Sequence, residues 1–184
     1  FDNLAASLDV AGHEIGHGVI QFSANLRYEN QSGALNESFA DIFGVSIDAD
    51  DWNLGEDILP SGKFLRSMSN PASGRSPQPG HMDDFRFLPN TKEGDWGGVH
   101  INSGIQNRAF YLLAEGNSKE GRGQSIGRDD AERIAYAALL KLTPNSEYTD
   151  SANQWVLEAD LIFGANSSQV TAVGQAWANV GVEI

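Results

Sequence analysis

The sequence predicts a mainly α-helical domain, a helical bundle built on one long helix near the start of the chain and interrupted by a long irregular loop region. Three observations lead to this prediction. Apolar residues recur every three or four positions in six segments of the chain. Residues 48–89 show no sustained period and are rich in Gly, Pro and Ser. A length of 184 residues allows one domain with a real core, so residues 1–184 are taken as a single domain.

Each predicted helix follows from its apolar spacing. The first is predicted over residues 4–23, and a polar, Gly-containing turn at 28–33 separates it from a second at 34–47. Gly16 lies inside the first helix, where glycine costs about 1 kcal/mol relative to Ala, so we expect close packing against it. Four more helices are predicted after the loop region: 102–115, 129–142, 151–163 and 168–180.

The composition excludes several classes of function. The formal net charge of −13 argues against a nucleic-acid partner, because phosphates require clustered Lys and Arg. The same charge disfavours an anionic membrane surface, and no apolar run approaches the roughly 20 residues of a transmembrane helix. Without cysteine the chain can form neither disulfides nor thiolate zinc sites. Any metal site must therefore use the four histidines and the carboxylates.

The sequence His13-Glu14-Ile15-Gly16-His17 is an H-E-x-x-H motif inside the first predicted helix, so the bundle is built on a long HExxH helix. Four residues advance a helix by about 400°, which leaves the two imidazoles about 40° apart and able to reach one ion. Glu14 is turned about 100° from His13, too far to join easily as a ligand but within reach of a water on the metal. A lone motif of this kind can also arise by chance on an exposed helix.

A third metal ligand is predicted on the second helix. Glu37 follows His17 after 19 intervening residues, and Asp41 lies one turn further on the same face. Two histidines, one glutamate and an open water position form a catalytic zinc geometry, whereas structural zinc sites are closed by four protein ligands. Asp41 supplies the second carboxylate that holds such a site from behind. The stretch G-A-L-N-E-S-F-A-D, at this distance from the motif, argues against a chance match.

Four segments of the chain resemble the C-terminal catalytic domain of the thermolysin-like neutral metallopeptidases, a gluzincin family. The segments are D-V-A-G-H-E-I-G-H (9–17), S-G-A-L-N-E-S-F-A-D-I-F-G (32–44), L-R-S-M-S-N-P (65–71) and G-G-V-H-I-N-S-G-I (97–105). The resemblance implies one bound zinc ion with three ligands and two side chains that support the imidazoles. The implied ligands are His13, His17 and Glu37, and the implied supports are Asp41 and Asn36.

The resemblance also implies which groups act on a peptide substrate. Glu14 would be the general base, taking a proton from the zinc-activated water and delivering it to the leaving amine. His100, oriented by Asp95, and Tyr28 would donate hydrogen bonds to the oxyanion of the tetrahedral intermediate. Arg66 would hold a substrate backbone carbonyl, with an ordinary surface or loop-pinning arginine as the alternative.

Four apolar residues fall where the family builds its pocket for the residue after the scissile bond: Val10, Leu54, Ile58 and Leu65. This position implies an endopeptidase that cleaves on the amino side of bulky hydrophobic residues. Plain core packing is the alternative for all four. His81 matches no functional position and is expected to be a loop histidine.

The acidic run D-A-D-D-W-N-L-G-E-D (48–57) is a second candidate metal site, because calcium takes about six to eight hard oxygen ligands. The resemblance places the family's calcium cluster at Asp9, Asp48, Asp51, Asn53 and Glu56. One calcium is expected rather than two, since Asp48 and Asn53 stand where Glu is common. Bound calcium would keep so irregular a segment ordered. A merely acidic, solubilising loop is the alternative.

The family places its substrate cleft between this domain and an N-terminal, β-rich domain, of which these residues contain none. The chain begins at Phe1 without an initiator Met or a signal-like stretch, so we expect sequence upstream of it. The isolated chain should bind zinc but show weak or no proteolysis. The rival hypothesis is a catalytically incompetent zinc- and calcium-binding module. Secretion is implied by the resemblance, a cytoplasmic location stays open, and no role is predicted for residues 69–92.

Overall fold

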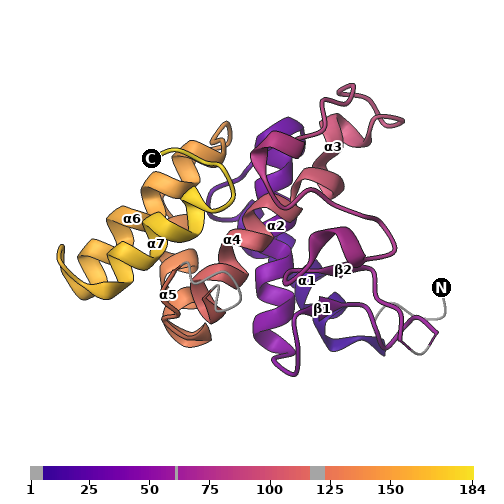
Figure 1. The fold of residues 1–184 in the computed structure, drawn as a ribbon. Coiled ribbons are helices and arrows are strands. Elements are labelled where there is room, and N and C mark those ends of the chain that lie inside the picture. The colour runs from indigo at the N-terminus through magenta and orange to yellow at the C-terminus, as the bar shows by residue number, and fades with distance from the viewer. Residues whose placement is uncertain (1–5, 61, 117–122) are drawn as a thin grey trace.

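The computed structural model describes residues 6–60, 62–116 and 123–184 and confirms the mainly α-helical class (Figure 1). Its helices are α1 (Leu8–Gln21), α2 (Asn30–Ile47), α3 (Asp95–Asn102), α4 (Gly104–Glu115), α5 (Arg128–Leu139), α6 (Tyr148–Phe163) and α7 (Ser168–Ala178). The loop region contains two antiparallel strands and two 3₁₀ turns: β1 (Asn53–Leu54), β2 (Arg66–Ser67), η2 (Pro71–Ser73) and η3 (Met82–Asp84). In the strand pair, Asn53 lies opposite Ser67 and Leu54 lies opposite Arg66. Of the helices described, none has both the length and the apolar character needed to cross a membrane.

The turn predicted at 28–33 is largely helical, because α2 begins at Asn30 rather than at residue 34. Gly33 packs so closely on Val99 that a side chain would not fit there. Ser32 is buried, and its hydroxyl finds a partner by donating to the Glu29 carbonyl at 3.1 Å. Local polarity therefore predicts a turn, whereas the tertiary contact with α3 favours a helix.

The helix predicted at 102–115 begins at Gly104, and a separate short helix, α3, precedes it. The first four residues of α3 have positive φ angles: 55° at Asp95, 52° at Trp96, 87° at Gly97 and 81° at Gly98. They form a left-handed turn, a conformation that two glycines make accessible and that costs about 1 kcal/mol or more at each other residue. The apolar spacing of the sequence gives no sign of this turn.

The remaining helix ends differ from the predictions for local reasons. Helix α6 begins at Tyr148 rather than 151, because Glu147 and Asp150 form a capping box at its start. Helix α5 ends at Leu139 rather than 142, since the next residues make the tighter bonds of a turn. Helix α7 ends at Ala178 rather than 180 for the same reason. Helix α1 lies inside the range predicted for it, whose first two residues are outside the described part of the chain.

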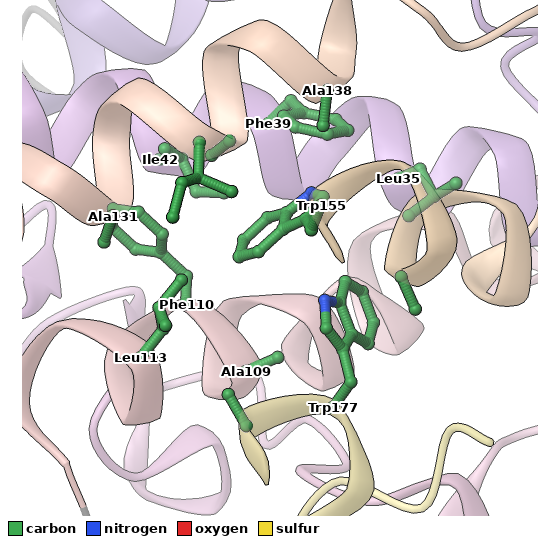
Figure 2. Close-up of a cluster of buried hydrophobic side chains, with 14 of the residues drawn as sticks. Leu35, Phe39, Ile42, Ala109, Phe110, Leu113, Ala131, Ala138, Trp155 and Trp177 are labelled. Carbon is green, nitrogen blue, oxygen red and sulfur yellow. The ribbon is translucent and has the colours of Figure 1, made fainter. Parts of the chain in front are cut away.

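The hydrophobic core lies among α2 and the last four helices (Figure 2). Trp155 on α6 and Trp177 on α7 are fully buried and meet edge to face, with ring centroids 5.3 Å apart. Phe110 on α4 contacts Trp155 with centroids 6.2 Å apart. Truncating a buried tryptophan to Ala costs about 3–5 kcal/mol, so this cluster anchors α6 and α7 to the bundle.

Helix α1 packs closely against α2 and contributes Ile20 to this core. The close packing expected at Gly16 is confirmed, because a Cβ there would lie 3.1 Å from the Ala40 Cα and 3.0 Å from the Phe43 ring. A Cβ at Gly12 would likewise lie 2.9 Å from the Ile47 side chain. Small residues at these two positions let the backbones approach, and the histidines of α1 are thereby brought next to the polar face of α2.

Candidate metal centre

The two histidines of α1 and Glu37 of α2 converge on one point. The Nε2 atoms of His13 and His17 lie 3.0 Å apart. Each of these nitrogens is 3.5 Å from an oxygen of the Glu37 carboxylate. Among the described residues these three side chains form the one group whose ligand atoms all lie within 4.8 Å of one another.

Hydrogen bonds behind the imidazoles fix which ring nitrogens face the centre. His13 Nδ1 lies 2.7 Å from the carboxylate of Asp41, and His17 Nδ1 lies 2.7 Å from Oδ1 of Asn36. The Asn36 amide is oriented by its other end, which donates to the Leu26 carbonyl at 3.1 Å. Both Nδ1 atoms therefore carry the proton, and both Nε2 atoms present lone pairs.

This arrangement fits a zinc ion. Two nitrogen lone pairs 3.0 Å apart, beside a carboxylate, repel one another unless a cation lies among them. Oε2 of Glu37 is buried and has no hydrogen-bond partner within the described chain, as expected of an atom whose partner is a metal. Two neutral imidazoles, each held from behind, and one carboxylate are the ligand set of catalytic zinc sites.

Asp41 is fully buried, and its carboxylate accepts four hydrogen bonds. His13 Nδ1 and Arg66 Nη2 reach Oδ1 at 2.7 and 2.6 Å, while Arg66 Nε and Asn107 Nδ2 reach Oδ2 at 2.9 and 2.8 Å. Burial opposes ionisation of this carboxyl, but the Arg66 guanidinium and His13 outweigh it and hold the pKa of Asp41 below its usual value. Asp41 therefore stays charged and keeps the His13 ring in place.

Asn107 on α4 and Ser38 on α2 belong to this network and were not identified from the sequence. Both are fully buried, and the Ser38 hydroxyl donates to Oδ1 of Asn107 at 2.7 Å. The sequence contains one indication of this network: Asn107 lies among the apolar positions of a predicted helix, and a buried polar side chain needs a hydrogen-bond partner. The identity of that partner depends on how α4 crosses α2, which the local pattern does not contain.

His100 and Tyr28 lie on the other side of Glu37. Asp95 binds His100 twice, accepting from its backbone N–H at 2.8 Å and lying 2.6 Å from Nδ1 of its ring. His100 Nε2 lies 3.0 Å from the Tyr28 hydroxyl and 3.4 Å from Glu37 Oε1. The Tyr28 hydroxyl donates to Glu37. Burial, together with the charge of Glu37, raises the pKa of Tyr28 far above its usual value, so its proton is retained.

Two cavities meet at His13, Glu14 and His100. One, of about 480 Å³, is mostly polar, and its further lining residues include Gln21 and Asn25. The other, of about 280 Å³, is mostly apolar and lies towards the strand pair. The side chain of Glu14 is exposed and borders both cavities. An extended peptide bound across both cavities would pass over the metal ligands.

Three of the four residues predicted for the apolar pocket line the second cavity: Val10, Leu54 and Leu65, together with Arg66. Ile58 does not line it. Ile58 lies in the turn of residues 56–59, in which the Leu59 N–H donates to the Glu56 carbonyl at 3.3 Å. The alternative of core packing also applies to Leu54, which belongs to the hydrophobic core, whereas Leu65 is only partly buried.

The acidic segment after α2 does not form a compact cation cage in the described structure. Asp9 is buried and its carboxylate accepts from the backbone N–H groups of Val10 and Gly55, at 2.6 and 2.5 Å. Asp51 accepts from the backbone and side chain of Asn53, at 2.6 and 3.0 Å. Among the described residues, no three of the acids Asp9, Asp48, Asp51 and Glu56 share the spacing found at His13, His17 and Glu37.

Asp48 and Glu56 nevertheless both lie among other acids of this part of the chain. For both, burial raises the pKa of the carboxyl, and the neighbouring acids of the segment raise it further. Oε2 of Glu56 is buried and has no hydrogen-bond partner within the described residues.

His81, expected to be a loop histidine, caps the 3₁₀ turn η3 by accepting from the Asp83 N–H at 3.1 Å.

Comparisons with known proteins agree on one family. The family model described as thermolysin metallopeptidase, alpha-helical domain, matches residues 24–182. Bacillolysin of Brevibacillus brevis is 48% identical over 98% of this chain and 34% of its own length. Extracellular elastase of Staphylococcus epidermidis is 45% identical over 99% of this chain and 33% of its own length. The solved precursor of protealysin, a metalloproteinase from Serratia proteamaculans, matches with a TM-score of 0.81 and 38% identity, over 97% of this chain and 58% of that one.

Proposed function

The chain belongs to the thermolysin metallopeptidase family, and from this membership we propose that it is the zinc-bearing catalytic part of an endopeptidase. The observation that carries the proposal is the convergence of two Nε2 lone pairs and the Glu37 carboxylate within 4.8 Å. The chain spans about a third of the length of the two curated relatives named above, so the activity of the whole protein belongs to the proposal.

The residues around the centre have distinct tasks in peptide hydrolysis. A bound zinc ion supplies Lewis-acid polarisation of the peptide carbonyl and makes water more acidic. Glu14, exposed where the two cavities meet, accepts the proton of the attacking water and passes it to the leaving amine. His100, in the doubly protonated form in which Nδ1 binds Asp95 and Nε2 can donate, and Tyr28 donate hydrogen bonds to the oxygen that becomes negative as the carbonyl is attacked.

The apolar cavity of about 280 Å³ supports a preference for a bulky hydrophobic residue after the scissile bond. Val10, Leu54 and Leu65 supply its walls, and Arg66 stands at its edge with its guanidinium held by Asp41. Two nitrogens of Arg66 bind Asp41, and these bonds fix the orientation of the planar guanidinium. In that orientation the guanidinium would donate a hydrogen bond to a substrate backbone carbonyl. Cleavage would thus occur on the amino side of the hydrophobic residue.

The outer face of α1 supports a second domain as partner. Leu8 and Ile15 lie seven residues apart on this face, and Phe22 follows directly after the helix ends; the three residues are 55%, 66% and 90% exposed. Gly12 and Gly16, about 40° and 80° around the helix from Leu8, pack on α2, and His13 and His17 lie about 140° and 180° from Leu8. Three exposed large apolar side chains along and just after the catalytic helix are typical of a surface that another domain covers. We assign that cover to an N-terminal, β-rich domain that completes the cleft, without which the chain cleaves peptides weakly or not at all.

One calcium ion is proposed at the acidic segment. The raised pKa values of Asp48 and Glu56 and the unpartnered oxygen of Glu56 show a cost of ionisation that a cation would relieve. Asp9, Asp51 and Asn53 would complete the site after rearrangement of their internal bonds.

An extracellular location is also proposed, with support from the name of the staphylococcal relative, extracellular elastase.

Replacing the general base tests the function. In the zinc-loaded full-length enzyme, Glu14→Gln should remove turnover of a peptide substrate, because the amide cannot take up the proton, while the zinc content stays unchanged. Zinc is measured by atomic absorption on the same samples. Retained turnover in Glu14→Gln would overturn the base assignment. A parent enzyme that binds zinc but cleaves no peptide would favour the alternative, a zinc-binding module without catalysis.

A further inference from the structure

Residues 69–92 connect two parts of the candidate site and have no task in the mechanism above. They leave β2, which carries Arg66, and lead to α3, which carries His100. Within the segment lie only the 3₁₀ turns η2 and η3. It nevertheless follows a defined path, because two buried side-chain amides bind it to α3.

The first of these amides is Gln78, which lies between two prolines and is 3% exposed. Its Nε2 donates to the backbone carbonyl of His100 at 2.7 Å and to the Ser103 hydroxyl at 2.8 Å. Since a carbonyl oxygen can only accept, the amide must turn its nitrogen towards His100. The backbone N–H of Gln78 donates to the Pro71 carbonyl at 3.0 Å, so the residue is itself held in place.

The second amide belongs to α3 and binds the segment eight residues further on. Oδ1 of Asn102 accepts from the Arg86 N–H, and its Nδ2 donates to the Arg86 carbonyl, both at 3.0 Å. Asn102 is fully buried, and its own carbonyl accepts from the Tyr148 hydroxyl of α6 at 2.7 Å. Residues 69–92 are therefore hydrogen-bonded to α3 on both sides of η3, at Gln78 before it and at Arg86 after it.

His100 depends on such external bonds for its position. Its side chain is 48% exposed, so packing contributes little to holding it. Helix α3 spans eight residues, and its first half is the left-handed turn of Asp95 to Gly98. So short a helix has too few internal bonds to be stable alone. Asp95 holds the ring and the backbone N–H of His100, and Gln78 holds its carbonyl.

We propose that residues 69–92 position His100 for catalysis and that Gln78 is the positioning residue through which they act. The inference rests on the proposed function, in which His100 donates to the developing oxyanion. Gln78 lines neither of the two cavities and bonds to none of the metal ligands; it binds the His100 carbonyl and Ser103, whose hydroxyl also donates to that carbonyl at 3.3 Å.

The test compares Gln78→Met with the parent in the zinc-loaded full-length enzyme. Methionine keeps the length of the side chain and removes the donor. We expect kcat to fall on the order of tenfold, because small misplacements of a catalytic group are costly, while KM and zinc content stay unchanged. The matched control is Gln106→Met, since Gln106 is also fully buried and accepts from the Ser151 hydroxyl of α6 at 2.7 Å. It should lower the melting temperature without lowering kcat.

A double-mutant cycle with His100→Ala separates positioning from general damage. If Gln78 acts through His100, Gln78→Met should lower kcat in the parent but cause no further loss in His100→Ala. Gln78→Asn, which keeps the amide but is one methylene shorter, should show an intermediate loss and serves if the methionine variant does not fold. The same fold-loss in both backgrounds, or parental kcat in Gln78→Met, would overturn the inference while leaving the proposed function intact. Parental kcat in His100→Ala would overturn both.

Discussion

Replacement of Asp41 by Asn perturbs the metal centre without touching a ligand. The carboxylate accepts two hydrogen bonds at each oxygen, from His13 and Arg66 at one and from Arg66 and Asn107 at the other. An asparagine must place its NH₂ group at one of these positions, where it meets two donors. If it faces His13, it removes the bond that keeps the proton on Nδ1 and the lone pair on Nε2.

The magnitude follows from these contacts. Loss of the group behind a metal-binding histidine typically weakens metal binding about 10–100-fold, or about 1.4–2.7 kcal/mol. The free energy of unfolding should fall by more, about 3–5 kcal/mol, because the largely buried Arg66 loses its charge partner. Competitive zinc titration with a chelating dye measures the first quantity, and urea denaturation of the zinc-free protein measures the second.

The matched control is Asp130→Asn. Asp130 also pairs with an arginine, Arg133, at 3.4 Å, but both side chains are solvent-accessible. Exposed pairs contribute about 0–1 kcal/mol, so this variant should keep the parental zinc affinity and nearly all of its stability. Zinc affinity of Asp41→Asn within about twofold of the parent would refute the reasoning, since it would show that the buried carboxylate does not orient His13.

Three further predictions concern the surroundings of the centre. Gly16→Ala should lower the melting temperature despite the better helix propensity of Ala, because the added Cβ lies 3.1 Å from the Ala40 Cα; a higher melting temperature would contradict the packing account. The folded-state pKa values of Asp48 and Glu56 are raised, so the folded state binds more protons than the unfolded state. Without calcium, the free energy of unfolding should therefore fall as the pH rises through the carboxylate range. Millimolar calcium should abolish this pH dependence, and a melting temperature unchanged by calcium would favour a bare loop. Phe22→Ser should weaken binding of the added N-terminal domain in calorimetry and leave zinc content unchanged, whereas parental affinity would place the domain elsewhere.

The features that could be predicted from the sequence are those with a local signature. The spacing of His13 and His17 on a helix determines that both rings face one side, and the structure places their Nε2 atoms 3.0 Å apart. Glu37 could be found because its distance along the chain suits a helix–turn–helix arrangement. Family resemblance added roles for His100 and Arg66, whose surroundings in the sequence carry no chemical pattern of their own.

The features that could not be predicted depend on tertiary contacts. Asp41 draws its donors from α1, β2 and α4, and only the folded chain brings Arg66 and Asn107 to it. The left-handed turn at the start of α3 has no apolar period and is held by contacts with other segments. Gln78 lies in a stretch that resembles an irregular loop, and its buried position depends on the path of that stretch past α3. Ile58 shows the opposite case, because its hydrophobicity suits the apolar pocket but it lies in a local turn and is not among the residues that line the cavity.

Zinc content and peptide hydrolysis, measured on one sample with and without an added N-terminal domain, test the central claim most directly. We predict about one zinc ion per chain in both states, with cleavage before bulky hydrophobic residues appearing once the domain is present. Absence of zinc after purification without chelators would contradict the claim that His13, His17 and Glu37 form a metal centre.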